Sequence, residues 1–114
     1  MTSEAQRLHG HLIGQQGSRR SLNTPALVLD LDALEHNIAA MAAYAKARRI
    51  GLRPHVKTHK SVEIARRQIA AGARGVSAAT LGEAEVMVDG GIPGVLITSP
   101  VVPPAKIEAL AALN

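Results

Sequence analysis

The chain has 114 residues, of which 46% are apolar, one is aromatic and none is cysteine, and its net charge is +4. This length allows one ordinary domain at most, the apolar content excludes a disordered polypeptide, and the lack of cysteine excludes disulfides, thiolate metal sites and a cysteine nucleophile. The apolar runs are too short for a membrane span, the N-terminus lacks a signal-peptide pattern, and one aromatic residue gives no stacking platform for nucleic acid, so we expect a cytoplasmic protein that binds neither membrane nor nucleic acid.

The first part of the chain changes character at about residue 24. Residues 1–23 are polar and show no apolar periodicity, so we expect a flexible N-terminal extension. Residues 25–29 form a short apolar run that predicts a strand. Asp32, with Glu35 three residues later, is typical of a helix N-cap with a capping box, and Gly51 is the expected end of that helix.

The same order of strand, helix and glycine repeats through the rest of the chain. Thr80 and Glu83 form a second capping-box pattern, at the start of a helix that Gly90 and Gly91 end. Proline is favoured in the first turn of a helix, and Pro103 and Pro104 therefore predict the start of the last one. The remaining elements are strands over residues 52–57, 74–79 and 94–99, and helices over residues 61–71 and 80–90.

This alternation of short apolar strands with helices predicts a parallel sheet covered by helices. The four expected strands begin near residues 25, 52, 74 and 94. A closed (β/α)₈ barrel of the TIM type needs roughly 200 residues or more. We therefore expect the domain over residues 24–114 to be a partial barrel of this type, with about half of the barrel present.

Basic residues are concentrated in the middle of the chain. Residues 46–74 contain nine lysines and arginines and one glutamate. Such a field attracts nucleic acid or a small anionic ligand. For most of these arginines the simpler interpretation is a solvated helix surface.

Four basic side chains alternate along one short segment: Arg53, His55, Lys57 and His59. If the segment is a strand, the first three share one face, and His59 extends the series if the strand continues. They lie toward the C-terminal end of the strand, where α/β sheets bind their ligands, and basic groups there are costly unless an anion meets them. A lysine amine in such a place is a nucleophile toward a carbonyl group.

Two other interpretations of this segment remain open. The side chains can form a solvated and inert strand end. His55 and His59 can also be metal ligands, but their spacing is weak evidence, and no cysteine or nearby carboxylate completes a site.

The octapeptide Arg53-Pro-His-Val-Lys-Thr-His-Lys60 resembles the R-P-H-x-K-T-H-K signature of the D-threonine aldolase and D-serine dehydratase family. These are fold-type III pyridoxal-phosphate enzymes related to alanine racemase. Three further segments resemble the same family. Residues 24–32 resemble its opening strand, residues 65–72 resemble the helix after the signature, and residues 81–87 resemble the start of the next helix. The resemblance covers residues 24–114 and leaves residues 1–23 outside it.

The resemblance implies that Lys57 holds pyridoxal 5'-phosphate, with His55, His59 and Arg53 as neighbours that tune the site. Lys60 is the competing candidate, which fits less well because it falls at a helix start. The resemblance also implies that residues 25–30 can pair with a second domain, which leaves three barrel strands here. The family's phosphate-binding loops, its ring-contacting tyrosine and its ligands for a divalent metal are expected beyond Asn114, so no metal ligand is expected in this chain.

By this resemblance the protein is a pyridoxal-phosphate-dependent lyase, an aldolase or dehydratase of β-hydroxy D-amino acids such as D-threonine, D-serine or 3-hydroxyaspartate. We expect the 114 residues alone to be inactive, because a catalytic site works only when all its parts are held together. The alternative is a non-catalytic protein that binds the cofactor, or an inactive fragment with a structural role. A homodimer is expected from the resemblance, and an open sheet edge independently favours association.

Overall fold

The computed structural model describes residues 8–114, and the chain divides into two compact units, residues 1–30 and 31–114. Residues 1–7 of the expected flexible extension lie outside the described residues. Residues 8–23 include two 3-10 turns, Gly10–Leu12 and Ser18–Ser21, and Asn23 N–H donates to His9 Nε2 at 3.1 Å. The first unit therefore holds local helical turns in its described part.

The strand predicted over residues 25–29 is wrong. Residues 26–30 lie outside the strands of the structure. The side chains of Leu27, Val28 and Leu29 are exposed, that of Leu27 completely. An apolar run forms a strand only when a neighbouring strand completes its hydrogen bonds, a condition that composition alone does not meet.

The first helix of the second unit, α2, spans Leu31–Ala47 and is longer at its start and shorter at its end than predicted. Asp32 lies in the first turn instead of at the N-cap, where a carboxylate still interacts favourably with the helix dipole. The helix ends before Gly51, because Arg49 takes the left-handed conformation (φ 57°) and Ile50 N–H donates to Ala45 O at 3.0 Å. The residue that turns the chain is thus an arginine, which sequence patterns do not favour there.

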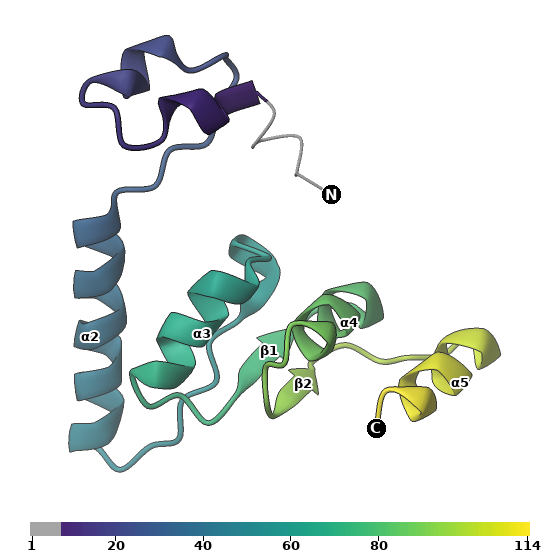
Figure 1. The fold of residues 1–114 in the computed structure, drawn as a ribbon. Coiled ribbons are helices and arrows are strands. Elements are labelled where there is room, and N and C mark those ends of the chain that lie inside the picture. Colours follow the sequence, from purple (N-terminus) through teal and green to yellow (C-terminus); the bar gives the residue numbers. More distant parts are fainter. Residues whose placement is uncertain (1–7) are drawn as a thin grey trace. The chain divides into compact units, whose positions relative to one another are not determined.

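The remaining helices and two of the strands confirm the predicted order. Helix α3 spans Val62–Ala70, strand β1 Val76–Ala78, helix α4 Leu81–Asp89, strand β2 Val95–Ile97 and helix α5 Pro104–Ala112 (Figure 1). Strands β1 and β2 are parallel neighbours, in the register Val76 to Val95 and Ala78 to Ile97. The expected βαβ arrangement is therefore formed around α4.

Residues 52–55 run beside β1 on the side away from β2. Arg74 N–H donates to Leu52 O at 2.9 Å, Ser77 N–H donates to Pro54 O at 2.8 Å, and His55 forms a parallel bridge with Ser77. The strand predicted over residues 52–57 is thus reduced to a single bridge at His55, because the chain leaves the sheet at Val56–Thr58 in a 3-10 turn, η3. The order across the sheet is residues 52–55, β1, β2.

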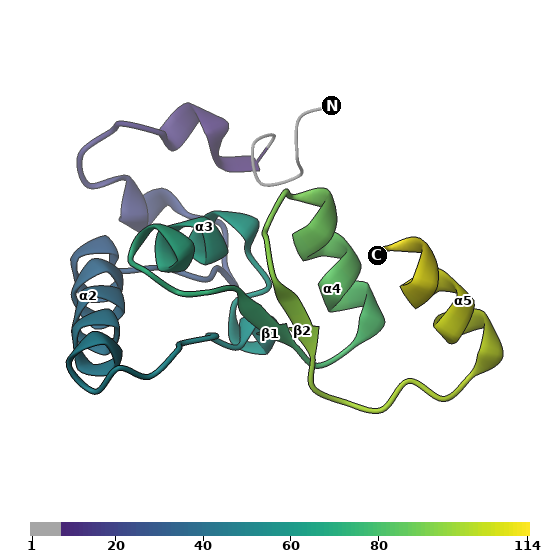
Figure 2. The same cartoon turned by 90° about the horizontal axis from the view of Figure 1, so that it is seen from below.

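The core lies between this sheet and the helices α3 and α4, which Figure 2 shows on the same side of the strands. Fully buried Val56, Val76 and Met87 fill its centre, and Ala65 of α3 lets that helix approach closely. Helix α2 packs beside α3, where Arg67 forms ion pairs with Glu35 and Glu63. Within residues 8–114, no helix has both the length and the apolar character that a membrane span needs.

The opposite face of the sheet carries the side chains of the candidate site. Residues paired across a parallel sheet point to the same face, so His55, Ser77 and Leu96 form one row across the three segments. In this row Leu96 is 50% exposed, whereas Ser77 is buried. The next row, two residues farther toward the C-terminal ends of the strands, consists of Lys57, Ala79 and Thr98.

Candidate functional site

The candidate site lies at the C-terminal ends of the parallel strands, where η3 carries the chain from the sheet toward α3. His55 is the last residue paired with β1, and Lys57 lies in the middle of the turn that follows. This is the edge at which α/β sheets bind ligands.

Arg53 lies two residues before His55, in the segment that runs beside β1. Its guanidinium donates from Nη1 to Gly94 O, just before the start of β2. It reaches that carbonyl across Gly75, where a Cβ atom would collide with both Gly94 O and the guanidinium. The contact that the structure gives Arg53 is therefore with the backbone at the N-terminal end of the sheet, away from Lys57.

His55 connects three segments of the chain. Its Nδ1 accepts a hydrogen bond from Lys57 N–H at 3.3 Å, and its Nε2 lies 3.2 Å from Thr98 Oγ1. The Thr98 hydroxyl donates in turn to Ala78 O at 3.1 Å, and Thr98 N–H donates to the same carbonyl at 2.9 Å. The imidazole is thus held between the lysine turn and the end of β2.

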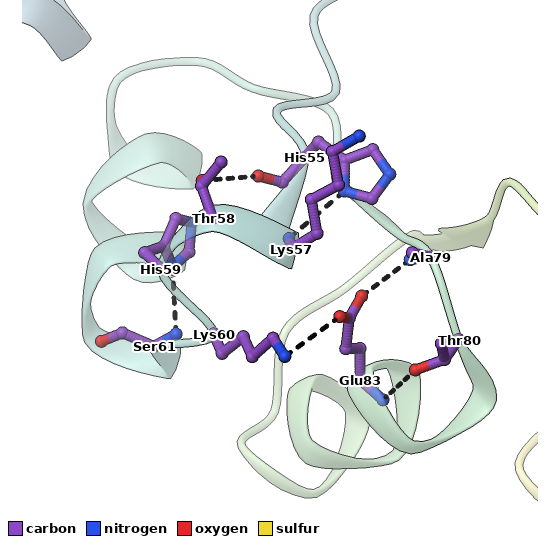
Figure 3. Close-up of polar contacts among 9 residues, drawn as sticks. All are labelled: His55, Lys57, Thr58, His59, Lys60, Ser61, Ala79, Thr80 and Glu83. Carbon is purple, nitrogen blue, oxygen red and sulfur yellow. Dashed lines mark hydrogen bonds and ion pairs between the residues drawn. The ribbon is translucent and has the colours of Figure 1, made fainter.

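Lys57 presents its amine on the side of the His55 ring. Figure 3 shows its side chain leaving the turn next to that ring and away from His59, Lys60 and Glu83. The side chain is exposed, and Nζ makes no ion pair with any of residues 8–114. An exposed lysine amine without a carboxylate partner is accessible to a carbonyl compound.

Lys60, the competing lysine, has a different environment. Its Nζ lies 3.7 Å from Glu83 Oε1, and the other oxygen of that carboxylate accepts from Ala79 N–H at 2.8 Å. Glu83 N–H donates to Thr80 Oγ1 at 3.2 Å, which confirms Thr80 as the N-cap of α4. In a capping box the Glu83 carboxylate would accept from the backbone N–H of Thr80, but here it accepts from that of Ala79, the residue before the cap. The same carboxylate forms the ion pair with the Lys60 ammonium.

His59 faces the protein and not the open end of the strands. Its Nδ1 accepts from Ser61 N–H at 3.0 Å. Its Nε2 and the Oε1 of Gln68 are both buried without a hydrogen bond of normal geometry. Burial lowers the pKa of the His59 imidazole, and the nearby Gln68 side chain and the Ser61 backbone oppose part of that effect.

The predicted common face of Arg53, His55, Lys57 and His59 is therefore only partly formed. The structure brings His55 and Lys57 together, places the Arg53 guanidinium at the N-terminal end of the sheet, and turns His59 toward α3. The change at His59 follows from η3, because a 3-10 turn ends the alternation of side chains that an extended strand would continue. The part of each residue in cofactor binding stays a prediction.

The octapeptide and its surroundings match a known family. The alanine racemase N-terminal domain matches residues 29–114, which include the whole candidate site.

The chain belongs to the alanine racemase N-terminal domain family.

Relatives of this alanine racemase N-terminal domain include aldolases and a dehydratase. It is 47% identical over 92 residues to a D-threonine aldolase of an Arthrobacter species, a match that covers 81% of this chain and 24% of the relative. It is 43% identical over 95 residues to the D-threo-3-hydroxyaspartate dehydratase of Delftia sp. strain HT23, covering 83% of this chain and 25% of the relative. The crystal structure of D-threonine aldolase from Filomicrobium marinum matches with a TM-score of 0.79 and 55% identity, over 81% of this chain and 25% of that one. The chain spans about a quarter of the length of these relatives.

The comparison with this structure supports the predicted fold class, a partial barrel of the alanine racemase N-terminal type. Within residues 8–114 of this domain, no three His, Cys, Asp or Glu side chains are grouped closely enough to hold a metal ion.

One residue of the site in this alanine racemase N-terminal domain was missed from the sequence. Thr98 lies 43 positions after His55, and no local pattern connects the two. The available signal was a hydroxyl residue directly after a strand, and Ser99, one position later, carries the same functional group. Ser77, on the neighbouring strand β1, donates from Oγ to Arg53 O at 3.3 Å and supports the neighbouring backbone.

Proposed function

We propose that the protein containing this chain is a pyridoxal-phosphate-dependent lyase of β-hydroxy D-amino acids, and that Lys57 is the residue to which the cofactor is covalently attached. The observation that carries the proposal is the difference between two neighbouring lysines. Lys57 is exposed beside His55 without an ion pair among residues 8–114, whereas Lys60 is paired with Glu83. The names of the relatives, an aldolase of D-threonine and a dehydratase of 3-hydroxyaspartate, support the substrate class.

The residues present fit the aldehyde end of the cofactor. The Lys57 amine supplies the nucleophile, and the bonded His55 ring supplies a fixed polar neighbour at the same edge of the sheet. When bound, the cofactor's pyridine ring withdraws electrons from the substrate's Cα and weakens the bonds to that atom. Cleavage of the Cα–Cβ bond is the aldolase reaction, and loss of the Cα proton together with the β-hydroxyl is the dehydratase reaction.

Lys57 and His55 have separate parts in this proposal. Lys57 binds the cofactor, and because it forms no ion pair with a carboxylate among residues 8–114, its amine stays available for that bond. His55, whose ring is bonded on both nitrogens, orients the turn that carries the lysine. We assign Arg53 and His59 a supporting part, because their contacts are with Gly94 O and Ser61 N–H.

The wider proposal extends to the complete protein. We propose D-threonine, D-serine and 3-hydroxyaspartate as the substrates to be compared, a homodimer as the assembly, and a divalent metal bound outside this chain. We also propose a cytoplasmic location, which is consistent with a chain that lacks cysteine.

A chimera tests this function directly. Residues 29–114 replace the matching segment of the Filomicrobium marinum D-threonine aldolase, which is 55% identical to this chain. The purified chimera is incubated with pyridoxal phosphate and each D-amino acid, and aldehyde and oxo-acid products are measured, with the L-enantiomers as controls. We expect product from D-enantiomers, loss of turnover in Lys57→Ala and retention in Lys60→Ala. Cofactor binding without product from any of these substrates would favour a non-catalytic binding protein.

A further inference from the structure

A continuous series of hydrogen bonds joins Lys57 to the end of β1 through two side chains. Lys57 N–H bonds to His55 Nδ1 at 3.3 Å, His55 Nε2 bonds to Thr98 Oγ1 at 3.2 Å, and Thr98 Oγ1 bonds to Ala78 O at 3.1 Å. The series crosses the C-terminal edge of the sheet from the first segment to the last strand.

The direction of every bond in the series is determined by its two ends. A backbone carbonyl only accepts, so the Thr98 hydroxyl donates to Ala78 O and has its lone pairs left for the imidazole. A backbone N–H only donates, so His55 Nδ1 accepts from Lys57. The one arrangement that satisfies both ends is a neutral His55 ring with its proton on Nε2, donating to Thr98.

We propose that Thr98 is a positioning residue that selects this tautomer of His55 and thereby holds the backbone of Lys57 at the end of the strand. The inference rests on the proposed function for its purpose, because a fixed Lys57 turn matters most if that lysine carries the cofactor. Its structural content can be tested without any cofactor.

Thr98 is suited to this task by its own anchoring. Both its N–H, at 2.9 Å, and its hydroxyl, at 3.1 Å, donate to Ala78 O. The threonine is therefore held against β1 independently of its contact with the imidazole. The next residue, Ser99, is exposed and carries the same functional group one position farther along the chain. Ser99→Ala is therefore a matched control for the loss of one hydroxyl at the end of β2.

Nuclear magnetic resonance of the 114-residue chain measures both consequences. Long-range proton–nitrogen correlation reports the tautomer of His55, and amide exchange reports the protection of Lys57 N–H. We expect the Nε2–H tautomer in the wild type, in Thr98→Ser, which keeps the hydroxyl, and in Ser99→Ala. In Thr98→Val, which keeps the shape, loss of one hydrogen bond shifts the tautomer ratio and accelerates Lys57 amide exchange, each by about fivefold.

Two results would overturn the inference: a wild-type His55 ring protonated on Nδ1, or a tautomer ratio and a Lys57 exchange rate that do not change in Thr98→Val. Unchanged dispersion of the core resonances in Thr98→Val, compared with the control Ser99→Ala, separates a local effect from unfolding. The rate of pyridoxal-phosphate attachment to Lys57 is measured on the same samples. If the wild-type chain shows the predicted tautomer but the chimera described above takes up no cofactor at Lys57, the proposed function fails while the positioning of His55 by Thr98 stands.

Discussion

Replacement of Glu83 by glutamine distinguishes the contributions to stability of the different contacts that its carboxylate makes. One oxygen accepts from Ala79 N–H at 2.8 Å, and the other lies 3.7 Å from Lys60 Nζ. The carboxylate also lies in the first turn of α4, where negative charge is favourable. Glutamine keeps an oxygen acceptor for Ala79 but removes the charge.

The expected cost follows from the exposure of each partner. The side chain of Glu83 is 12% exposed and that of Lys60 is 67% exposed, so solvent screens the ion pair and its share is at most about 0.5 kcal/mol. A charged acceptor is worth about 1 kcal/mol more than a neutral one in a hydrogen bond of this kind. The helix dipole adds about 0.5 kcal/mol. We therefore expect Glu83→Gln to lower the free energy of unfolding by about 1.5–2 kcal/mol, most of it through the backbone contacts.

Urea unfolding of a matched set of variants tests this assignment. Lys60→Met removes only the ion pair and is expected to cost less than about 0.5 kcal/mol. Glu83→Ala leaves the part-buried Ala79 N–H without its acceptor and is expected to cost about 2–3 kcal/mol. A Lys60→Met variant as unstable as Glu83→Gln would refute the reasoning, because the ion pair would then be the dominant contact.

Three further outcomes follow from the structure. Gly75→Ala is expected to destabilise the chain by about 1–3 kcal/mol, because the added Cβ would collide with Gly94 O. Gly82→Ala, whose Cβ would have nothing within 4 Å, is expected to stabilise α4 by about 0.5–1 kcal/mol. The urea midpoints of the two variants show whether the two effects differ in sign. Burial lowers the pKa of His59 below its ordinary value of 6.5, so as the pH falls the unfolded state binds the proton first, and the contribution of neutral His59 to stability, complete above about pH 6.5, is lost toward the folded pKa. His59→Asn is therefore expected to lose less stability than the wild type between about pH 7.5 and about pH 5. An identical pH dependence of the two proteins would contradict this assignment. Met87→Ala, at a fully buried position, is expected to cost about 2–5 kcal/mol in the same unfolding measurement, and a cost below about 1 kcal/mol would mean that the core is not formed as described.

Features of the fold that depend on neighbouring residues could be predicted from the sequence. The start of α4 at Thr80 follows from a hydroxyl three residues before Glu83, and both contacts of that pair lie within five residues. Pro104 at the start of α5 depends in the same way on the local chain. These elements are determined by hydrogen bonds and conformations that the sequence places side by side.

Features that depend on distant partners could not be predicted in this way. Residues 25–29 have the composition of a strand, but a strand also needs a neighbour to pair with. The turn at Val56–Thr58 ends the strand pattern in the middle of the octapeptide, and this turns His59 toward α3. Thr98 meets His55 only because two βα units bring their strand ends together. Sequence patterns describe the lysine segment but not the contacts that arrange it.

The central claim is that Lys57, and not Lys60, holds the cofactor. The most direct test is to add pyridoxal phosphate to the chain, reduce with borohydride and locate the modified lysine by mass spectrometry in the wild type, Lys57→Ala, Lys60→Ala and Glu83→Gln. We predict stoichiometric modification of Lys57 that disappears in Lys57→Ala, persists in Lys60→Ala, and is joined by modification of Lys60 when Glu83 loses its charge. Modification of Lys60 in the wild type, or equal modification of many lysines whatever the variant, would contradict this account.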